Sequence, residues 1–508
     1  MTSINMFRMR PLFGCVTAVL LSTVPVSPVV CQAPADVTKD IDAFVEQSMA
    51  AGLTPGLSVA VVRGSDIVYA KGFGFADRET GRRATADTQF YIASTSKSFT
   101  ALAGQLLAAR GVLDLDTPVR RALPSAKFHP QVPADQITLR ELLTHTHGIA
   151  AGGPVDFRTA YSGEHTNPLL LDLLRVHGPA STGKAFAYSN LGYNIFGLAV
   201  DEKLKEGWKE MLQREVFNPI GMRHTTGWMS KADPKNLALP YEFRSSGPER
   251  VAYAKQDANM HAAGGHLSTA NDLARYLVAH LNGGRVDGKQ VLPEAAVNAT
   301  HRQQVEQNRD FGSFHRFGWG LGWDLATYDS DTVLQRFGGF SGFFSHLSFM
   351  PEKRIGVVVL SNGGGAGGTI ADAVATYIYD RLLAKPGLAD RSERSLAAVT
   401  AQATRARENI KRDLATRQAR PQTTPLALAA YAGTYESPVL GRMDWSVDGG
   451  ALRVRMGIAS SVVEVYDGAQ HQFRVELTGG GSVVTFEVPA GSTQPIAASY
   501  QNQRFVRQ

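Results

Sequence analysis

Cysteine is almost absent from this sequence of 508 residues. Its two cysteines are Cys15 and Cys31, and both fall within the first 35 residues, which have the pattern of an export signal. If that segment is removed, the mature chain has no thiol. Disulfides, thiol nucleophiles and cysteine-based metal sites are then excluded together.

The N-terminal segment also lacks acidic residues. Arg8 and Arg10 precede an apolar run that begins at Leu12, and Ala33-Pro34-Ala35 supplies a small-residue cleavage site. The unbroken apolar part, Leu12–Val24, is too short to span a membrane comfortably, which argues against a retained anchor. We therefore expect a cleaved signal peptide and a periplasmic or secreted protein, and leave open an association with the cell envelope.

Motifs for metals and phosphates are missing as well. The 13 histidines include the close pairs His145/His147 and His261/His266, but no HExxH sequence or histidine–carboxylate set completes a site. Gly363-Gly364-Gly365 follows a predicted strand without the Lys-Ser/Thr partner of a phosphate-binding loop. We therefore expect no metal and no cofactor.

Charge gives no indication of a nucleic-acid partner. The formal net charge of +6 becomes +4 without Arg8 and Arg10, and much of the excess lies in residues 391–420, where eight basic residues face three acidic ones. No nucleic-acid recognition motif accompanies this stretch. We interpret it as a solvated helical surface and expect no nucleic-acid binding. The oligomeric state stays open.

What remains is the composition of a loop-rich globular enzyme with two or three folding units, 44% hydrophobic with 50 glycines. Gly56–Val62 and Val68–Gly74 predict a buried β-hairpin, and strands return at Leu334–Phe340, Gly342–Met350 and Ile355–Leu360. An antiparallel sheet built from both ends of this segment, with a helical region inserted between them, is the economical arrangement.

A candidate nucleophile opens a predicted helix. Ser94-Thr95-Ser96-Lys97 precedes apolar residues that recur at three- and four-residue spacing until Gly111. Residues three apart share a helix face, so Lys97 should lie beside Ser94. A serine hydroxyl needs a base, and burial can lower the pKa of a lysine enough to make it one. The Ser94 backbone N–H could also face an oxyanion.

The Ser-x-x-Lys pattern is weak evidence by itself. A second copy, Ser181-Thr182-Gly183-Lys184, lies in a loop where nothing fixes the lysine over the serine. Tyr188-Ser189-Asn190 supports the first copy, because residues two apart in an extended segment point the same way, so Tyr188 and Asn190 could share one cleft. A phenol beside a lysine could then relay the serine proton. The alternative is a tyrosine that packs ahead of the apolar helix Leu191–Leu204.

Ser94-x-x-Lys97 followed by Tyr188-x-Asn190 resembles the first two motifs of the serine β-lactamase and penicillin-binding-protein superfamily. The similarity is to class C β-lactamases, D-Ala-D-Ala carboxypeptidases, D-aminopeptidases and family VIII esterases. Framework segments resemble family landmarks in the same order; they are Phe90–Ala93, Ile137–Gly148, Ala263–Leu273 and Phe317–Trp323. The resemblance covers about residues 40–385.

The resemblance implies an α+β fold for residues 36–385, with a β-lactamase/transpeptidase-like antiparallel sheet flanked by helices. A signal peptide, residues 1–35, would precede this hydrolase domain, and a basic helical linker, residues 386–425, would follow it. Residues 426–508 have an all-β pattern. They are similar to the small, lipocalin-like barrel domains that often follow such hydrolases.

The third motif departs from the family, in which Lys-Thr-Gly or His-x-Gly on a strand helps to bind a substrate carboxylate. The matching position here reads Phe337-Gly338-Gly339, which we expect to contact substrate. We expect the Phe340 N–H to be the second oxyanion donor beside the Ser94 N–H. Arg336 is one residue out of phase and should point to the other face of the sheet. Without a cation, carboxylate binding would lose about 1.5–3 kcal/mol.

The resemblance therefore implies a serine hydrolase that is acylated at Ser94, with Lys97, Tyr188 and Asn190 as its other catalytic residues. The substrate would be a small-molecule ester, amide or β-lactam. The aromatic third motif favours an esterase-type acyl hydrolase. A D-Ala-D-Ala carboxypeptidase, a D-aminopeptidase and a β-lactamase are alternatives. A penicillin-binding or sensor protein without turnover is the alternative from another functional class.

Overall fold

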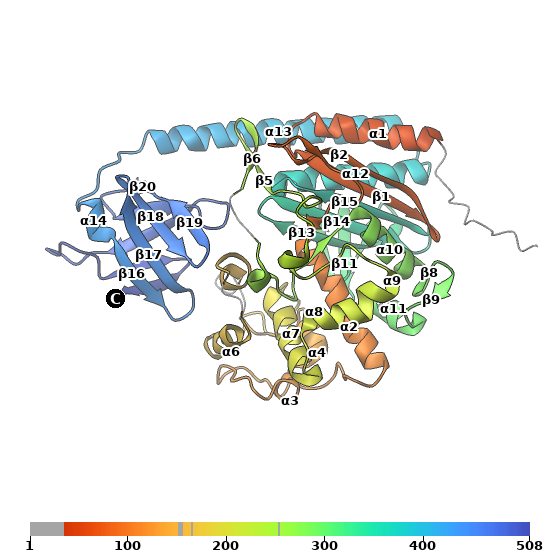
Figure 1. The fold of residues 1–508 in the computed structure, drawn as a ribbon, viewed down its shortest axis with the longest axis horizontal. Helices are drawn as coiled ribbons and strands as arrows, with labels where there is room; N and C mark the ends of the chain where they lie inside the picture. Colours follow the sequence, from red (N-terminus) through yellow and green to blue (C-terminus); the bar gives the residue numbers. More distant parts are fainter. Residues whose placement is uncertain (1–34, 151–155, 164–165, 252–254) are drawn as a thin grey trace, which may run out of the picture.

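The computed structural model describes residues 35–150, 156–163, 166–251 and 255–508 (Figure 1). All but the last residue of the predicted signal peptide, residues 1–35, lie outside this part of the chain. Helix α1 (Ala35–Met49) opens it. In the described ranges, no helix combines the length and hydropathy that a membrane crossing requires.

A nine-stranded antiparallel sheet organises the larger domain. The predicted arrangement is confirmed, because β15 pairs with β1 and so joins the two ends of the segment. In spatial order the strands are β10 (Val305–Phe311), β11 (Phe314–Trp319), β12 (Asp324–Tyr328), β13 (Asp331–Phe340), β14 (Phe343–Met350), β15 (Ile355–Ser361), β1 (Gly56–Arg63), β2 (Asp66–Asp77) and β3 (Arg82–Arg83).

Helices cover both faces of this sheet (Figure 1). On β1, Val59 and Val61 face one hydrophobic layer, and Ala60 and Val62 face the other. Because both faces are buried, the central strands are apolar almost throughout. The covering helices are α1, α12 (Gly364–Leu382) and α13 (Leu388–Gln418) on one side and α2 (Ser96–Ala109), α10 (Ala270–Leu281) and α11 (Glu294–Thr300) on the other.

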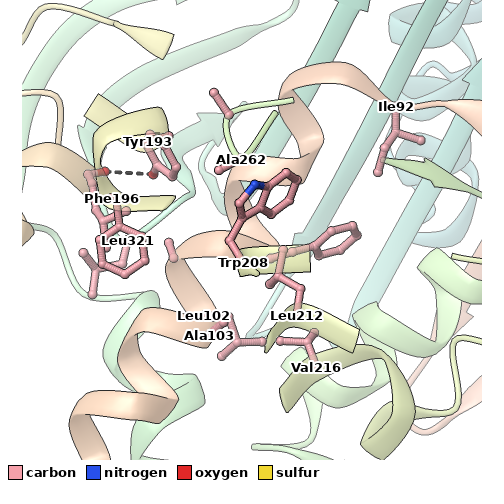
Figure 2. Packing of buried hydrophobic residues seen from close by; sticks show 14 of the residues in the cluster. Ile92, Leu102, Ala103, Tyr193, Phe196, Trp208, Leu212, Val216, Ala262 and Leu321 are labelled. Atoms are coloured by element: carbon pink, nitrogen blue, oxygen red, sulfur yellow. Dashed lines mark hydrogen bonds between the residues drawn. The ribbon is translucent and has the colours of Figure 1, made fainter. Parts of the chain in front are cut away.

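Helix α2 is buried on every side, although its apolar residues predict only one buried face. Eleven of its 14 residues are buried, including the polar residues at its start. Figure 2 shows Leu102 and Ala103 of α2 against Leu212 and Val216 from the inserted helical region. This region covers the face that would otherwise be exposed, and it thereby removes Lys97 from solvent.

The inserted region consists of short helices around the start of α2. Helix α7 begins where the Ser189 hydroxyl accepts a hydrogen bond from the Leu191 N–H, which fixes the neighbours Tyr188 and Asn190 at a helix N-terminus. The helices of this region are α3 (Val119–Ala122), α4 (Leu139–Leu143), α6 (Asn167–Val176), α7 (Asn190–Leu204), α8 (Trp208–Leu212) and α9 (Asn218–Ile220).

Helix α13 crosses from the larger domain to a second domain (Figure 1). At its start, Arg391 donates to Asp380 of α12 at 2.7 Å, and at its end Arg417 donates to Glu464 at 2.8 Å. The basic stretch is thus partly used in ion pairs that hold the helix at both ends. Much of its remaining surface is exposed.

The C-terminal domain is a nine-stranded, nearly closed antiparallel barrel, as expected. Its interior is filled by aromatic side chains, among them Tyr431, Trp445, Phe473 and Phe486. In spatial order its strands are β19 (Ala459–Val462), β18 (Ala451–Met456), β17 (Gly441–Asp448), β16 (Gly433–Ser437), β24 (Gln503–Arg507), β23 (Ala497–Tyr500), β22 (Ser482–Glu487), β21 (Gln472–Val475) and β20 (Glu464–Asp467).

The barrel docks on the segment Phe157–Tyr161 of the larger domain. Phe157 is buried in the barrel core, and the Ile458 N–H donates to the Ser162 carbonyl at 2.8 Å. The Ser341 hydroxyl, at the turn after β13, donates to the Thr478 carbonyl at 3.0 Å. The barrel therefore contacts both the end of β13 and the segment beside it.

Candidate active site

Ser94 lies in a tight turn between β4 (Phe90–Tyr91) and α2. Ala93 has a φ of +44°, a conformation that is unfavourable for a residue with a side chain. The Thr95 hydroxyl fixes the turn, since it lies 2.8 Å from the Ser345 hydroxyl of β14. Ser94 is left half-buried at the mouth of α2.

Lys97 is fully buried directly beside the serine. Its Nζ lies 3.1 Å from Ser94 Oγ, and it donates to Asn190 Oδ1 at 2.6 Å and to the Ala263 carbonyl at 2.8 Å. Burial lowers the pKa of Lys97 below its usual value. The predicted contacts from Lys97 to Ser94 and Asn190 are thus present. Burial disfavours the charged amine, and the neighbouring Tyr188 favours it.

Tyr188 completes the cluster around the serine. The Lys97 Nζ lies 4.8 Å from its ring centre, and Arg336 Nη2 lies 3.2 Å from its hydroxyl. Burial of the hydroxyl would raise the pKa of Tyr188, but the charges of Lys97 and Arg336 outweigh it and lower the pKa to about 8. Although the residue remains 42% exposed, its hydroxyl lies among cations. Tyr188 is therefore more acidic than an ordinary phenol.

The prediction that Arg336 points away from the site is wrong. Its guanidinium is buried and donates to the Ser94 carbonyl and the Tyr188 hydroxyl, both at 3.2 Å. Asp324 at the start of β12 accepts a third hydrogen bond from it at 2.9 Å. Side chains alternate along β13, and because Phe337 faces away from the cleft, its neighbour Arg336 faces the site.

Phe337 occupies the opposite face of β13, contrary to its predicted contact with substrate. It is 7% exposed and belongs to the hydrophobic layer under α12. Its ring packs against Phe314 and His346, with centroid distances of 6.2 Å and 4.7 Å. The third-motif position that faces Ser94 is therefore Arg336, and the strand carries a cation there after all.

The two glycines after Phe337 have different surroundings. A Cβ on Gly338 would lie 1.9 Å from the Ile92 carbonyl oxygen, so only glycine allows β13 to approach the turn before Ser94 this closely. A Cβ on Gly339 would meet nothing nearer than 3.8 Å, and the residue is exposed. Gly338 is thus required by packing, whereas Gly339 lies at the open edge of the strand.

The register of β13 decides in which direction the backbone N–H of Phe340, the predicted oxyanion donor, points. Phe340 and Phe343 flank a two-residue turn, so their backbone groups bond each other across the hairpin. The Phe337 carbonyl, by contrast, accepts from Arg336 on the other edge, where β13 extends beyond β12. Alternation places the Gly339 N–H on that same open edge, whereas the Phe340 N–H points to β14.

Asn190 joins Lys97 to a carboxylate that the sequence motifs did not reveal. Its Nδ2 donates to Asp156 Oδ1 at 2.8 Å, while its Oδ1 accepts from Lys97. Burial raises the pKa of Asp156. Asp156 directly precedes the helical segment Phe157–Tyr161, in sequence without a recognisable motif, and Asp324 follows the aromatic landmark Phe317–Trp323, so neither carried a signal that could have identified it.

Two of the paired histidines, His145 and His261, contact neighbouring side chains. His145 lies 4.6 Å from the ring centres of both Tyr188 and Trp319. Burial lowers the pKa of His145 well below its usual value, so the ring is neutral and supports Tyr188 as an aromatic neighbour. His261 contacts Asn194 in the core behind the site.

The second Ser-x-x-Lys copy is held by other partners. Lys184 donates to Glu141 at 2.6 Å and to the Gln136 carbonyl at 2.8 Å. Ser181 and Thr182 instead line a cavity of about 260 Å³ beside Tyr188. A second cavity of about 240 Å³ lies at the other end of the site, where Phe340 lines it.

Comparison with known proteins identifies the family. Residues 41–379 match the Beta-lactamase family model, so the chain belongs to the beta-lactamase family. Penicillin-binding protein 4 of Amycolatopsis lactamdurans is 30% identical over 336 residues, 65% of this chain and 85% of that protein. Protein flp of Staphylococcus aureus (strain MW2) is 26% identical over 64% of this chain, and the match spans only 63% of its length.

Solved structures share the fold at lower identity. The octameric penicillin-binding protein homologue from Pyrococcus abyssi aligns with a TM-score of 0.57 and 21% identity, over 92% of this chain and 99% of that one. A D-amino acid amidase from Ochrobactrum anthropi SV3 aligns with a TM-score of 0.58 and 23% identity, over 69% and 98%. The hydrolase EstCE1, described as having promiscuous acyltransferase activity, aligns with a TM-score of 0.57 and 22% identity, over 68% and 98%.

Proposed function

We propose that this protein is an esterase-type serine hydrolase that forms an acyl-enzyme at Ser94. The observation that carries the proposal is the position of the buried Lys97 Nζ, 3.1 Å from Ser94 Oγ, beside a Tyr188 whose pKa is lowered to about 8. Such a pair can remove the proton from a serine hydroxyl near neutral pH.

In the proposed acylation step, the Tyr188 phenolate takes the proton of Ser94 while the serine oxygen attacks the ester carbonyl. Lys97 and Arg336 hold the negative charge of the phenolate before the attack. The N–H groups of Ser94 and Gly339 stabilise the oxyanion, with Gly339 in place of Phe340 because of the strand register. Tyr188 then donates its proton to the departing alkoxide, and the carbon–oxygen bond of the ester breaks.

Deacylation repeats these proton transfers with water. Tyr188 takes a proton from the water molecule that attacks the acyl-enzyme and returns it to Ser94 Oγ as the acid departs. The cycle restores the starting protonation of both residues. Asn190 and Asp156 hold the Lys97 amine in place throughout.

A second candidate is a D-peptidase or amidase. Arg336 places a cation at the family's carboxylate-binding position, and its guanidinium is shared with Asp324 and Tyr188. The D-amino acid amidase that shares the fold and the related penicillin-binding protein 4 motivate the same test. A substrate carboxylate would need the positive charge of Arg336. We propose the esterase because Asp324 already compensates that charge.

A parallel assay of short-chain p-nitrophenyl esters, D-amino-acid amides and nitrocefin tests these candidates. We expect ester hydrolysis to dominate and Ser94→Ala to abolish it without loss of the fold. Turnover by Ser94→Ala would overturn the mechanism. Mass spectrometry after treatment with penicillin tests the alternative of a protein without turnover. A stable adduct without ester hydrolysis would indicate a penicillin-binding or sensor protein.

We propose in addition that the protein is exported. The support is the arrangement of Arg8, the apolar run and Ala33-Pro34-Ala35 in the sequence. Expression in a bacterial host, followed by N-terminal sequencing of the periplasmic fraction, should give a chain that begins at Asp36. A chain that keeps Met1 and stays in the cytoplasm would contradict this.

A further inference from the structure

The cavity of about 240 Å³ at the end of β13 contains cations in an otherwise largely apolar lining. Its apolar walls include Tyr91, Leu237 and Phe343, and its cationic residues are Lys255 and Arg250. Pockets of this kind bind ligands by apolar contact and use a few polar groups to fix their orientation. The lining therefore suits a short chain with an anionic end.

Strand β13 connects the surroundings of the nucleophile with this cavity. Arg336, Gly338 and Phe340 alternate on the face of β13 that meets the turn of Ser94. Two residues along a strand span about 6.6 Å, which is about the length of a short acyl chain. Phe340 lies at this distance along β13 from Gly338, which contacts Ile92. Strand β13 thus runs from the turn of Ser94 to the wall of the cavity.

Lys255 lies at the wall of the cavity in a setting that lacks a counter-ion. Its Nζ lies 3.8 Å from the Phe340 ring centre and 4.7 Å from that of Tyr91, and it donates to the Ala160 carbonyl at 2.9 Å. Among the described residues, no carboxylate forms an ion pair with it. Burial lowers the pKa of this amine well below its usual value.

We propose that the cavity behind Phe340 is the acyl subsite and that Lys255 selects acyl chains ending in a carboxylate, as in the half-esters of short dicarboxylic acids. The inference rests on the proposed function, because it assigns the acyl side of the same site. An arriving carboxylate favours the protonated form of the Lys255 amine. The ligand thus supplies the negative partner that Lys255 lacks among the described residues. The aromatic rings of Phe340 and Tyr91 stabilise the ammonium that forms.

The first test is kinetic. Mono-p-nitrophenyl esters of the series from succinate to suberate are compared with the esters of matching monocarboxylic acids. We expect the half-ester to be favoured in kcat/KM at one intermediate length, and Lys255→Met to lower this preference about tenfold or more. The same loss in Arg250→Met, with Lys255→Met unchanged, would overturn the assignment to Lys255.

The second test is independent of turnover. Adipate and the uncharged hexanamide are titrated calorimetrically into the full-length protein in two buffers of different ionisation enthalpy. We expect tighter binding of adipate with uptake of a proton, and loss of both in Lys255→Met. Equal affinity for adipate and hexanamide would overturn the proposal. A fluorophosphonate, which labels an active serine, separates the two proposals. If it labels Ser94 but half-esters are not preferred, only this inference fails. If it does not label Ser94, the proposed function fails as well.

Discussion

Arg336 Nη2 lies 3.2 Å from the hydroxyl of Tyr188 and an equal distance from the carbonyl of Ser94. One guanidinium thus contacts both the proposed proton carrier and the backbone of the nucleophile. Asp324 holds this guanidinium from behind at 2.9 Å. The residue that the sequence pattern placed on the wrong face of the sheet is therefore the one that links the third motif to the first two.

This contact predicts a pH dependence. The charges of Lys97 and Arg336 lower the pKa of Tyr188 to about 8, and the phenolate is the active form, so kcat should rise with pH through that value. Arg336→Met removes one of these charges and should move the rise toward about 10, the ordinary value for a phenol. Pre-steady-state acylation rates measured from pH 6 to 10 would check this. An unchanged profile in Arg336→Met would show that Arg336 does not act through Tyr188.

Lys97 and Lys184 form a matched pair, because each follows a serine by three residues. Lys97→Met should lower kcat/KM by about 10²–10⁴, the usual contribution of acid–base catalysis, since it removes a charge that keeps Tyr188 ionised. Stability should also fall, by about 1–3 kcal/mol for each acceptor, because Asn190 Oδ1 and the Ala263 carbonyl lose a buried donor. Lys184→Met breaks a surface ion pair with Glu141 and should leave kcat/KM unchanged. Equal losses in both variants would contradict the assignment.

Gly338 and Gly339 provide a steric test of the third motif. Gly338→Ala would place a methyl group 1.9 Å from the Ile92 carbonyl oxygen, which must displace the turn before Ser94. We expect it to cost about 1–3 kcal/mol of stability and most of the activity. Gly339→Ala meets only Phe344 at 3.8 Å and keeps its backbone N–H, so stability should be retained. Urea unfolding with ester assays would reveal the contrast, and a stable, active Gly338→Ala variant would refute the packing argument.

Phe157 tests whether the barrel supports the site. It is 1% exposed inside the barrel core, and Asp156 before it binds Asn190. Phe157→Ala should lower the free energy of unfolding by about 3–5 kcal/mol and reduce kcat, because the segment that carries Asp156 loses its anchor. Chemical denaturation and steady-state assays would measure both effects. Val462→Ala, at a barrel side chain that is 53% exposed, is the control and should change neither.

The sequence predicted more of the fold than of the contacts. The hairpin β1–β2, the return of three strands after the inserted helices and the C-terminal barrel follow from alternating or continuous apolar patterns and from turn residues, which act locally. For the same reason, Ser94 and Lys97 could be paired from a single helical turn. The burial of α2 on all sides could not be predicted, because the covering helices lie more than a hundred residues later in the chain.

The sequence by itself thus determined the order of the motifs and the local spacing that brings Lys97 to Ser94. Only the tertiary structure decided which face of β13 meets the nucleophile, because a strand pattern is compatible with either phase until its neighbours fix the register. It also brought Asp156 and Asp324 to the site, and Lys255 to the cavity behind Phe340. These residues belong to segments without a local signal, and their roles come from contacts that form only when distant parts of the chain pack together.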